Sequence, residues 1–302
     1  MLYNNLSGYF REKYGRRPSK ICIDGGFSCP NRDGKCGEGG CIFCGERGSG
    51  EHINPAFSIS EQVKAALSIA EEDELFVAYF QNFTNTYASV EVLKERYDAA
   101  LIDKRIKALA IGTRPDCIDE DVCRLIAEYK KRLDVWVELG LQTASDKTAD
   151  VINRGYKRSA FEAAVKLLSK YDIPVVVHLI LGLPGEDIRD IKRTVDYINS
   201  FDIWGLKLHS IYVMEGTRLS LMYRLGEYTP PTLDEFVEAA VHVLTHVRPD
   251  MIIHRLTGDC PADMLVAPEW NKNKHKVLSE IVSAMEKGGF SQGCLYQGIT
   301  KQ

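Results

Sequence analysis

The sequence lacks any hydrophobic run long enough to span a membrane, because its longest apolar stretches are about the length of a β-strand. Residues 1–20 contain no apolar core of the signal-peptide type. An excess of charge of one sign is also missing, since 38 Lys and Arg stand against 42 Asp and Glu, a formal net charge of −4. This balance argues against a protein that wraps a polyanion. We therefore expect a cytoplasmic protein with no membrane contact.

Low-complexity segments and repeats at solenoid spacing are also missing. What recurs is an alternation of short apolar segments with longer amphipathic ones, which predicts strands joined by helices. The expected strands are residues 20–24, 75–80, 106–111, 135–141, 173–181, 204–213 and 251–254. The expected helices are residues 60–72, 89–102, 119–131, 159–171, 187–199, 233–247 and 274–287.

This alternation is typical of α/β proteins with parallel strands that are buried on both faces. Two architectures fit it, an open doubly wound sheet and a full or partial β/α barrel. Both place their active sites at the carboxyl ends of the strands. The residues directly after each strand are therefore the candidates for chemistry.

Cysteine is unevenly distributed. The chain has nine, an odd number that argues against a disulfide framework in a protein without a signal peptide. Four of them lie in the Gly-rich segment after the first strand, namely Cys29, Cys36, Cys41 and Cys44. Thiolates this close repel one another unless a metal neutralises them, so the segment predicts a metal or redox site.

Three kinds of site compete for these thiols. A structural zinc site usually combines two Cys-x2-Cys pairs, and only Cys41-x2-Cys44 has that spacing here. A disulfide is disfavoured by the expected compartment. An iron–sulfur cluster held by three cysteines, with one iron left open, needs only this pair and one more thiolate. The spacing favours the cluster, and both Cys29 and Cys36 are candidates for the third ligand.

Several motifs resemble those of the radical S-adenosylmethionine (SAM) superfamily. Phe43 stands just before the last cysteine, and the spacing Cys29-x11-Cys41-x2-Cys44 is similar to that of the branch containing the Elongator catalytic subunit. Within that branch the chain resembles the YhcC/YtqA-type family. The motifs that carry this likeness are GFSCPNRDG (26–34), AYFQNFTNTY (78–87), TRPD (113–116), ELGLQT (138–143), HLILGLPGE (178–186) and HRLTGD (254–259).

The resemblance implies a partial (β/α)6 barrel at residues 19–247, between an N-terminal extension at 1–18 and a C-terminal α/β extension at 248–302. It also implies a [4Fe–4S] cluster that binds SAM, cleaves it reductively and so produces a 5′-deoxyadenosyl radical that abstracts hydrogen from a substrate. Because Pro30 follows Cys29, as a proline follows the first ligand in this branch, the implied ligands are Cys29, Cys41 and Cys44. An electron donor such as flavodoxin or ferredoxin would reduce the cluster.

For SAM itself, the resemblance and the strand ends together point to polar and Gly-rich positions. A glutamate on a buried strand is costly unless paired, so Glu138 would bind the SAM ribose or ammonium, or pair with an arginine such as Arg114. Arg154 would meet the SAM carboxylate or lie at the surface. The full set of expected SAM-binding residues is Phe43, Gln81, Asn82, Thr84, Glu138, Gln142, Arg154, Gly182 and Glu186.

The substrate side is predicted from polar residues on buried strands. Lys207 and His209 share one face of the sixth expected strand, which indicates a polar cavity on that face. His178 lies in the very apolar fifth strand. The alternatives are a core histidine at position 178 and a solvent-facing strand end at the other two.

The Elongator-like branch includes tRNA-modifying enzymes, so the resemblance raises tRNA, modified at the wobble uridine, as a substrate. Two short basic stretches, at residues 11–20 and 272–276, fit this hypothesis, although such stretches are also typical of a solvated surface. Three other interpretations remain: radical chemistry on a small metabolite, an electron-transfer iron–sulfur protein and a non-catalytic zinc-stabilised binding module.

Overall fold

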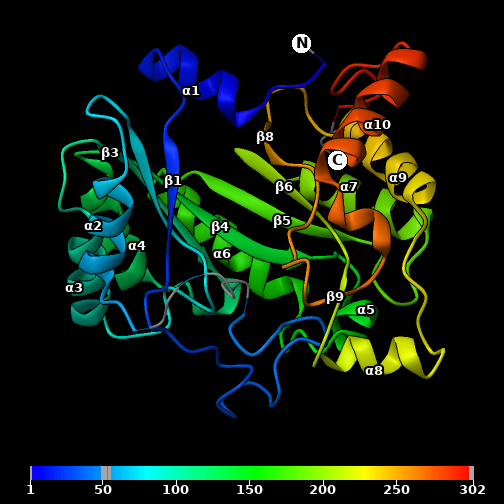
Figure 1. Cartoon of the computed structure of the whole chain (residues 1–302), viewed down its shortest axis with the longest axis horizontal. Coiled ribbons are helices and arrows are strands. Elements are labelled where there is room, and N and C mark those ends of the chain that lie inside the picture. Colours follow the sequence, from blue (N-terminus) through cyan, green and yellow to red (C-terminus); the bar gives the residue numbers. More distant parts are fainter. Residues whose placement is uncertain (1, 49–52, 54–55, 299–302) are drawn as a thin grey trace.

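The computed structural model describes residues 2–48, 53 and 56–298. Its centre is a parallel sheet with strand order β1-β2-β3-β4-β5-β6-β8, which curls into a half-barrel (Figure 1). Strands β1 and β8 form its two edges. The seven strands are β1 (Ser19–Ile23), β2 (Phe76–Phe80), β3 (Ile106–Thr113), β4 (Asp134–Gln142), β5 (Val175–Leu181), β6 (Gly205–Ser210) and β8 (Ile252–Arg255).

Helices cover the outer face of this sheet. Side chains alternate along each strand, so Ala78 and Phe80 of β2 join the large core under the helices, while Val77 and Tyr79 face the inside of the half-barrel. Capping boxes at Ser58 and Thr232 start two of the helices. The covering helices are α2 (Ile59–Ser68), α3 (Val90–Ala100), α4 (Glu120–Lys130), α6 (Arg158–Lys170), α7 (Ile188–Asn199), α9 (Leu233–His246) and α10 (Lys274–Lys287).

Helix α1 (Leu6–Tyr14) closes the amino end of the half-barrel. The Asn5 side chain caps it by accepting a hydrogen bond from the Gly8 amide at 2.8 Å. Its buried residues Leu6 and Phe10 pack with inward-facing side chains of β2 to β5, including Trp136. The amino end of the interior is therefore filled, and the open interior lies toward the carboxyl ends of the strands.

At the carboxyl ends, the cysteine segment meets several short elements (Figure 1). The Leu219 amide donates to the Ile42 carbonyl at 2.8 Å, which joins α8 (Arg218–Arg224) to the cysteine segment. Ile42 and Leu219 belong to a second buried apolar cluster there. The other short elements of this region are α5 (Asp146–Val151), the antiparallel pair β7 (Val213–Met214) and β9 (Leu265–Ala267), and the 3-10 turns η1 (Pro115–Cys117) and η2 (Glu269–Lys272).

The predicted partial α/β barrel is confirmed, with seven parallel strands where six were expected in the barrel, because β8 joins the same sheet. The strand expected at residues 204–213 was too long, since β6 ends at Ser210 and Val213 pairs with β9 instead. Helices α1, α5 and α8 were not predicted, because each is too short or too polar to show a clear helical period. Among the described residues, no helix is long and apolar enough to cross a membrane.

We predict that Phe10→Ala destabilises the fold by about 3–5 kcal/mol, because it leaves a cavity among fully buried rings. Phe10 is 2% exposed, and its ring centroid lies 6.2 Å from that of Trp136. Urea unfolding under anaerobic conditions measures the change. The matched control is Phe57→Ala, since Phe57 is 46% exposed. Equal loss of stability in the two variants would contradict the role given to α1.

Candidate functional site

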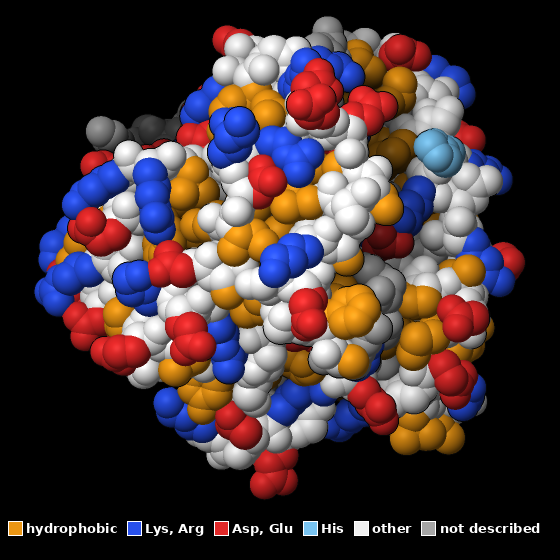
Figure 2. All heavy atoms as spheres, turned by 60° about the vertical axis from the view of Figure 1, so that its left-hand side comes forward, with side chains coloured by type: hydrophobic (Ala, Val, Ile, Leu, Met, Phe, Trp, Pro, Cys, Tyr) orange, Lys and Arg blue, Asp and Glu red, His pale blue; other side chains and the backbone are white. Residues whose placement is uncertain are grey.

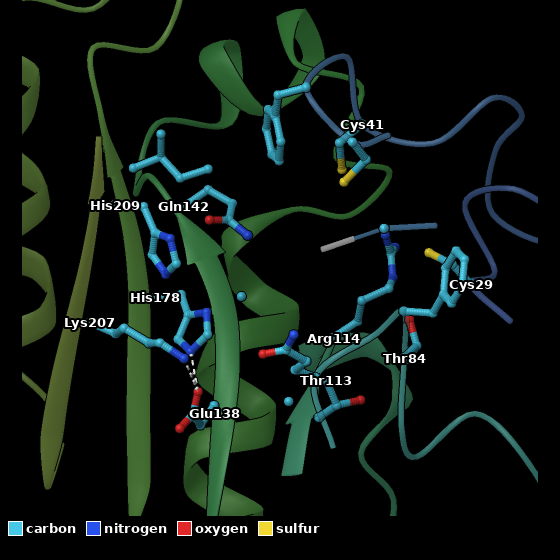
Figure 3. A pocket seen from close by; sticks show the side chains of 18 of the residues that line it. Cys29, Cys41, Thr84, Thr113, Arg114, Glu138, Gln142, His178, Lys207 and His209 are labelled. Carbon is cyan, nitrogen blue, oxygen red and sulfur yellow. Dashed lines mark hydrogen bonds and ion pairs between the residues drawn. The ribbon is translucent and has the colours of Figure 1, made fainter. Parts of the chain in front are cut away.

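A cavity of about 550 Å³ opens at the carboxyl ends of the strands and extends into the half-barrel. Figure 3 shows its two sides, with the cysteines at one and Glu138, His178, Lys207 and His209 at the other. Most residues expected from the sequence line it. They are Cys29, Cys41, Cys44, Phe43, Gln81, Thr84, Glu138, Gln142, Arg154, His178, Lys207 and His209.

The Cys41–Cys44 pair forms a tight turn that is held from several directions. The Cys44 amide donates to the Cys41 carbonyl at 3.0 Å, and the Ile42 amide donates to the Ile152 carbonyl at 3.1 Å. The thiol of Cys44 hydrogen-bonds to Cys41, and this contact lowers the pKa of Cys41 to about 7 and raises that of Cys44. The Asn31 side chain amide also lies 3.8 Å from Cys41 Sγ. The pair is therefore arranged to supply a thiolate near neutral pH.

The structure separates the two candidates for the third thiol. Cys29 lines the same cavity as Cys41 and Cys44. Cys36 is exposed, does not line the cavity, and has its Sγ 3.8 Å from Asp116 Oδ2. Among the residues that the structure describes, no three His, Cys, Asp or Glu side chains gather as the ligands of a single metal ion would.

The cavity wall next to the cysteines fits a bound polar cofactor. Thr84 lines the cavity, and its buried hydroxyl has no hydrogen-bond partner among the described residues. A buried polar atom without a partner is costly, and a ligand would satisfy it. Gln142 has a left-handed backbone with φ of +66°, a conformation that costs a non-glycine residue about 1–3 kcal/mol and is frequent at functional sites.

Two arginines support the wall between the cysteines and the strands. Arg154 is 1% exposed and donates to the carbonyls of Leu141 and Thr143, the latter at 2.8 Å. It is therefore a buried residue and not the surface arginine considered as its alternative. Arg114 forms a bidentate pair with Asp116 at 2.7 and 2.9 Å and does not contact Glu138 as expected. Both guanidinium groups lie over the ring of Tyr156.

The carboxylate of Glu138 is completely buried and occupies the centre of the opposite wall. Its Oε2 accepts from Lys207 Nζ at 2.8 Å and lies 2.7 Å from His178 Nε2, while Oε1 accepts from Trp136 Nε1 at 3.0 Å. Lys207 Nζ also donates to the Tyr79 hydroxyl at 2.8 Å. Strands β2, β4, β5 and β6 each contribute to this network, which is dashed in part in Figure 3.

The network keeps Glu138 ionised and its neighbours weakly basic. Burial alone would raise the pKa of Glu138, but Lys207 and His178 outweigh it and hold the pKa well below its ordinary value. Burial lowers the pKa of Lys207 to about 8, although Glu138 opposes the shift. Burial and the Lys207 charge lower the pKa of His178 to about 4. At neutral pH the wall therefore holds one carboxylate, one ammonium and a neutral imidazole.

Two further histidines complete this side. The ring centroid of His209 lies 5.3 Å from that of His178, and its buried Nε2 has no partner among the described residues. His254 packs edge-on against Trp136 and Trp204, with its Nδ1 4.0 Å from Glu138 Oε1. Burial lowers the pKa of both histidines well below the ordinary value. Lys207 and His209 thus lie inside the half-barrel and not at a solvent-facing strand end.

Three of the expected SAM-binding residues do not line the cavity. Asn82 donates to Asp24 Oδ2 at 2.9 Å. The Gly182 carbonyl accepts from the Tyr228 hydroxyl at 2.7 Å, and a Cβ at Gly182 would lie 2.7 Å from Pro231. Glu186 accepts from the Thr143 hydroxyl, and burial raises the pKa of its carboxyl. Their cofactor-binding role stays a prediction.

The sequence analysis missed Tyr79 and Tyr156 as parts of the site. Tyr79 holds Lys207, and Tyr156 stacks under two guanidinium groups. The period of two along β2 places Tyr79 on the inner face and could have identified it. Tyr156 lies in a loop after α5, where no periodicity marks which side chains turn inward.

Comparison with protein families gives two matches. The model of the radical SAM superfamily matches residues 33–198, and the model of the Radical_SAM C-terminal domain matches residues 203–287. Together these matches cover most of the described chain.

Curated relatives match over nearly the full length. The uncharacterized protein YtqA of Bacillus subtilis is 36% identical over 304 residues, which cover 99% of this chain and 94% of YtqA. Protein YhcC of Escherichia coli is 34% identical over 295 residues, 97% of this chain and 96% of YhcC. A tRNA uridine(34) acetyltransferase of Methanocaldococcus jannaschii is 29% identical over 198 residues, 64% of this chain but only 35% of that enzyme.

Among solved structures, the archaeal Elp3 of Methanocaldococcus infernus with an N-terminal deletion shares the fold. The TM-score is 0.66 at 22% sequence identity. The match covers 78% of this chain, which spans 59% of that structure. The shared part therefore agrees with the half-barrel described above.

We predict that Glu138→Gln and Lys207→Met each destabilise the fold by about 3–5 kcal/mol, because each leaves an uncompensated buried charge. The double variant removes both charges and should lose less stability than the sum of the two single variants. Anaerobic urea unfolding of all four proteins gives the coupling free energy. Additive losses would contradict a direct ion pair between the two side chains.

Proposed function

Because the chain belongs to the radical SAM superfamily and, within it, to the YhcC/YtqA family, we propose that the cavity described above is its active site. Family membership confirms the two cofactors expected from the sequence, a [4Fe–4S] cluster and SAM. The observation that carries the proposal is that Cys29, Cys41 and Cys44 line the same cavity as the buried Glu138 network. The cysteine side would bind the cofactors and the Glu138 side would bind the substrate.

Cys29, Cys41 and Cys44 would hold the cluster, and Cys36 would not. When bound and reduced, the cluster supplies the electron that cleaves SAM, so that the 5′-deoxyadenosyl group can abstract hydrogen from the substrate. Thr84, Gln81 and Gln142 line the adjacent wall with groups that can hydrogen-bond SAM. The half-barrel around them excludes water from the reacting groups.

We propose tRNA, at the wobble uridine, as the substrate. Two observations support this. A tRNA uridine(34) acetyltransferase is among the relatives of the chain. In addition, Arg17, Lys20 and Arg255 line the cavity, and they come from the strand edges β1 and β8 or lie next to them. Exposed basic side chains at the mouth of a cavity are suited to phosphate contacts. A small anionic metabolite is the second candidate, on the same basic lining.

An electron donor such as flavodoxin or ferredoxin completes the proposed reaction, because reductive cleavage of SAM consumes one electron. The cysteine segment lies at the edge of the fold, beside α8 (Figure 1). A donor protein would therefore reach the cluster from this end and leave the mouth between β1 and β8 for the substrate.

The first test is formation of 5′-deoxyadenosine. After anaerobic reconstitution with iron and sulfide, dithionite and SAM should yield 5′-deoxyadenosine, measured by chromatography. A zinc-containing, colourless protein that never assembles a cluster would contradict the proposed function.

We predict that alanine at position 29, 41 or 44 abolishes the cluster, because an open-iron cluster with only two protein thiolates is not retained. Cys36→Ala should keep the full iron content, since the Cys36 thiol lies outside the cavity. Iron analysis and the visible absorption of each reconstituted variant measure the effect. Loss of iron in Cys36→Ala together with retention in Cys29→Ala would reverse the ligand assignment.

We predict that tRNA binding weakens steeply with salt and that Arg17→Ala/Lys20→Ala lowers the slope of log K against log[salt] by about 2, one unit for each phosphate contact. The control is Lys64→Ala/Lys166→Ala, which removes two exposed charges from the outer helices. Filter binding over a salt series measures the slopes. Absence of tRNA binding even at low salt would rule out tRNA and favour a small substrate.

A further inference from the structure

The Glu138 network contains more than hydrogen abstraction needs. Removal of a hydrogen atom from carbon requires no acid or base, yet four inner strands converge on one buried carboxylate with a lysine and a histidine. Buried ion pairs contribute little net stability, because the cost of removing two charges from water offsets their attraction. A role in chemistry would account for an arrangement that stability alone does not favour.

The hydrogen bonds to Glu138 fix the tautomer of His178. Glu138 is a carboxylate and can only accept, so the proton of the neutral imidazole must lie on Nε2, 2.7 Å from Glu138 Oε2. The Nδ1 atom then carries a free lone pair. Figure 3 shows the His178 ring with one nitrogen toward Glu138 and its remaining edge toward the open cavity. This is the arrangement by which a carboxylate orients a histidine base.

Exposure distinguishes the roles within the network. The side chains of Glu138 and Lys207 are 0% and 4% exposed, whereas that of His178 is 17% exposed. A molecule in the cavity therefore reaches His178, while Glu138 and Lys207 lie behind it. Lys207 in turn is held by the Tyr79 hydroxyl at 2.8 Å, which fixes the position of its ammonium.

We propose that His178 accepts a proton from the substrate at Nδ1, and that Glu138 and Lys207 are positioning residues that hold its ring in the accepting tautomer. The proposal rests on the proposed function, because it assigns a role on the substrate side of the same site. It adds that the substrate carries an ionisable N–H or O–H group at or beside the carbon that loses hydrogen.

The proton transfer is balanced without any further reagent. The N–H or O–H bond of the substrate breaks, and an Nδ1–H bond forms on His178. The electron pair of the broken bond stays on the substrate, and no electron leaves it in this step. The imidazolium that results keeps its Nε2 proton toward Glu138, so the new positive charge lies against the carboxylate.

The charges around His178 set the pH range in which it can accept a proton. Glu138 faces it from β4, Lys207 and His209 from β6, and Arg255 and His254 from β8. Because burial and the nearby cations lower the pKa of His178 to about 4, the free imidazole is neutral at pH 5 and above. It gains a proton, and loses its accepting lone pair, only as the pH falls through about 4.

The first test needs no substrate. Long-range ¹H–¹⁵N spectra of the reconstituted protein, labelled with [¹⁵N]histidine, should show His178 as a neutral Nε2–H tautomer at pH 5 to 8. Glu138→Gln should abolish this tautomer preference, because the amide can also donate to the ring. A His178 that titrates near pH 6.5, or that carries its proton on Nδ1, would overturn the proposal.

The second test uses tRNA from a strain that lacks the gene, digested after reaction and analysed by nucleoside mass spectrometry. His178→Gln keeps a donor toward Glu138 but has no lone pair at the Nδ1 position. It should lower kcat at least about 100-fold, the usual contribution of a proton-transfer group, with KM changed less than about 3-fold. Added imidazole should partly restore the rate of His178→Gly.

The control for the second test is His242→Gln, which changes a histidine of α9 that stacks on His246 outside the cavity. Full activity of His178→Gln, or equal losses in the two Gln variants, would overturn the proposal. If the wild type alters no nucleoside in tRNA but forms 5′-deoxyadenosine, the tRNA substrate fails. The histidine spectra then decide the proposal about His178 by themselves.

Discussion

The buried carboxylate of Glu138 is the interaction on which the interior depends. An isolated charge at this depth would be expelled or neutralised, so its presence requires donors from the surrounding strands. Lys207, His178 and Trp136 provide them, and Tyr79 holds Lys207. Strands β2, β4, β5 and β6 must therefore keep their register for the network to form. The same requirement fixes the wall of the cavity opposite the cysteines.

The topology explains why this wall and the cysteine segment belong to one site. In a parallel sheet all carboxyl ends meet at one edge, and the cysteine segment follows β1 at that edge. Helix α1 fills the amino end with Leu6 and Phe10, so the free volume remains near the cysteines. The edges β1 and β8 leave a side of the half-barrel that carries Lys20 and Arg255.

The sequence was sufficient for the parts of this account that depend on local pattern. Apolar runs and helical periods predicted the seven strands of the barrel sheet, and the motifs predicted the family and its cofactors. Long-range pairing was not predictable: Glu138 was expected to contact SAM or Arg114, whereas Lys207 and His178 contact it across the half-barrel. The helix α1 was missed because its stability comes from packing under the barrel and not from its own period.

The central claim is that one cavity holds the cofactors at the cysteines and presents His178 to the substrate. An anaerobic crystal structure of the reconstituted protein with SAM tests it most directly. The account predicts a cluster on Cys29, Cys41 and Cys44 and a SAM molecule in the same cavity, with its ribose between the cysteines and His178. A cluster ligated by Cys36, or SAM bound outside the cavity, would contradict the account.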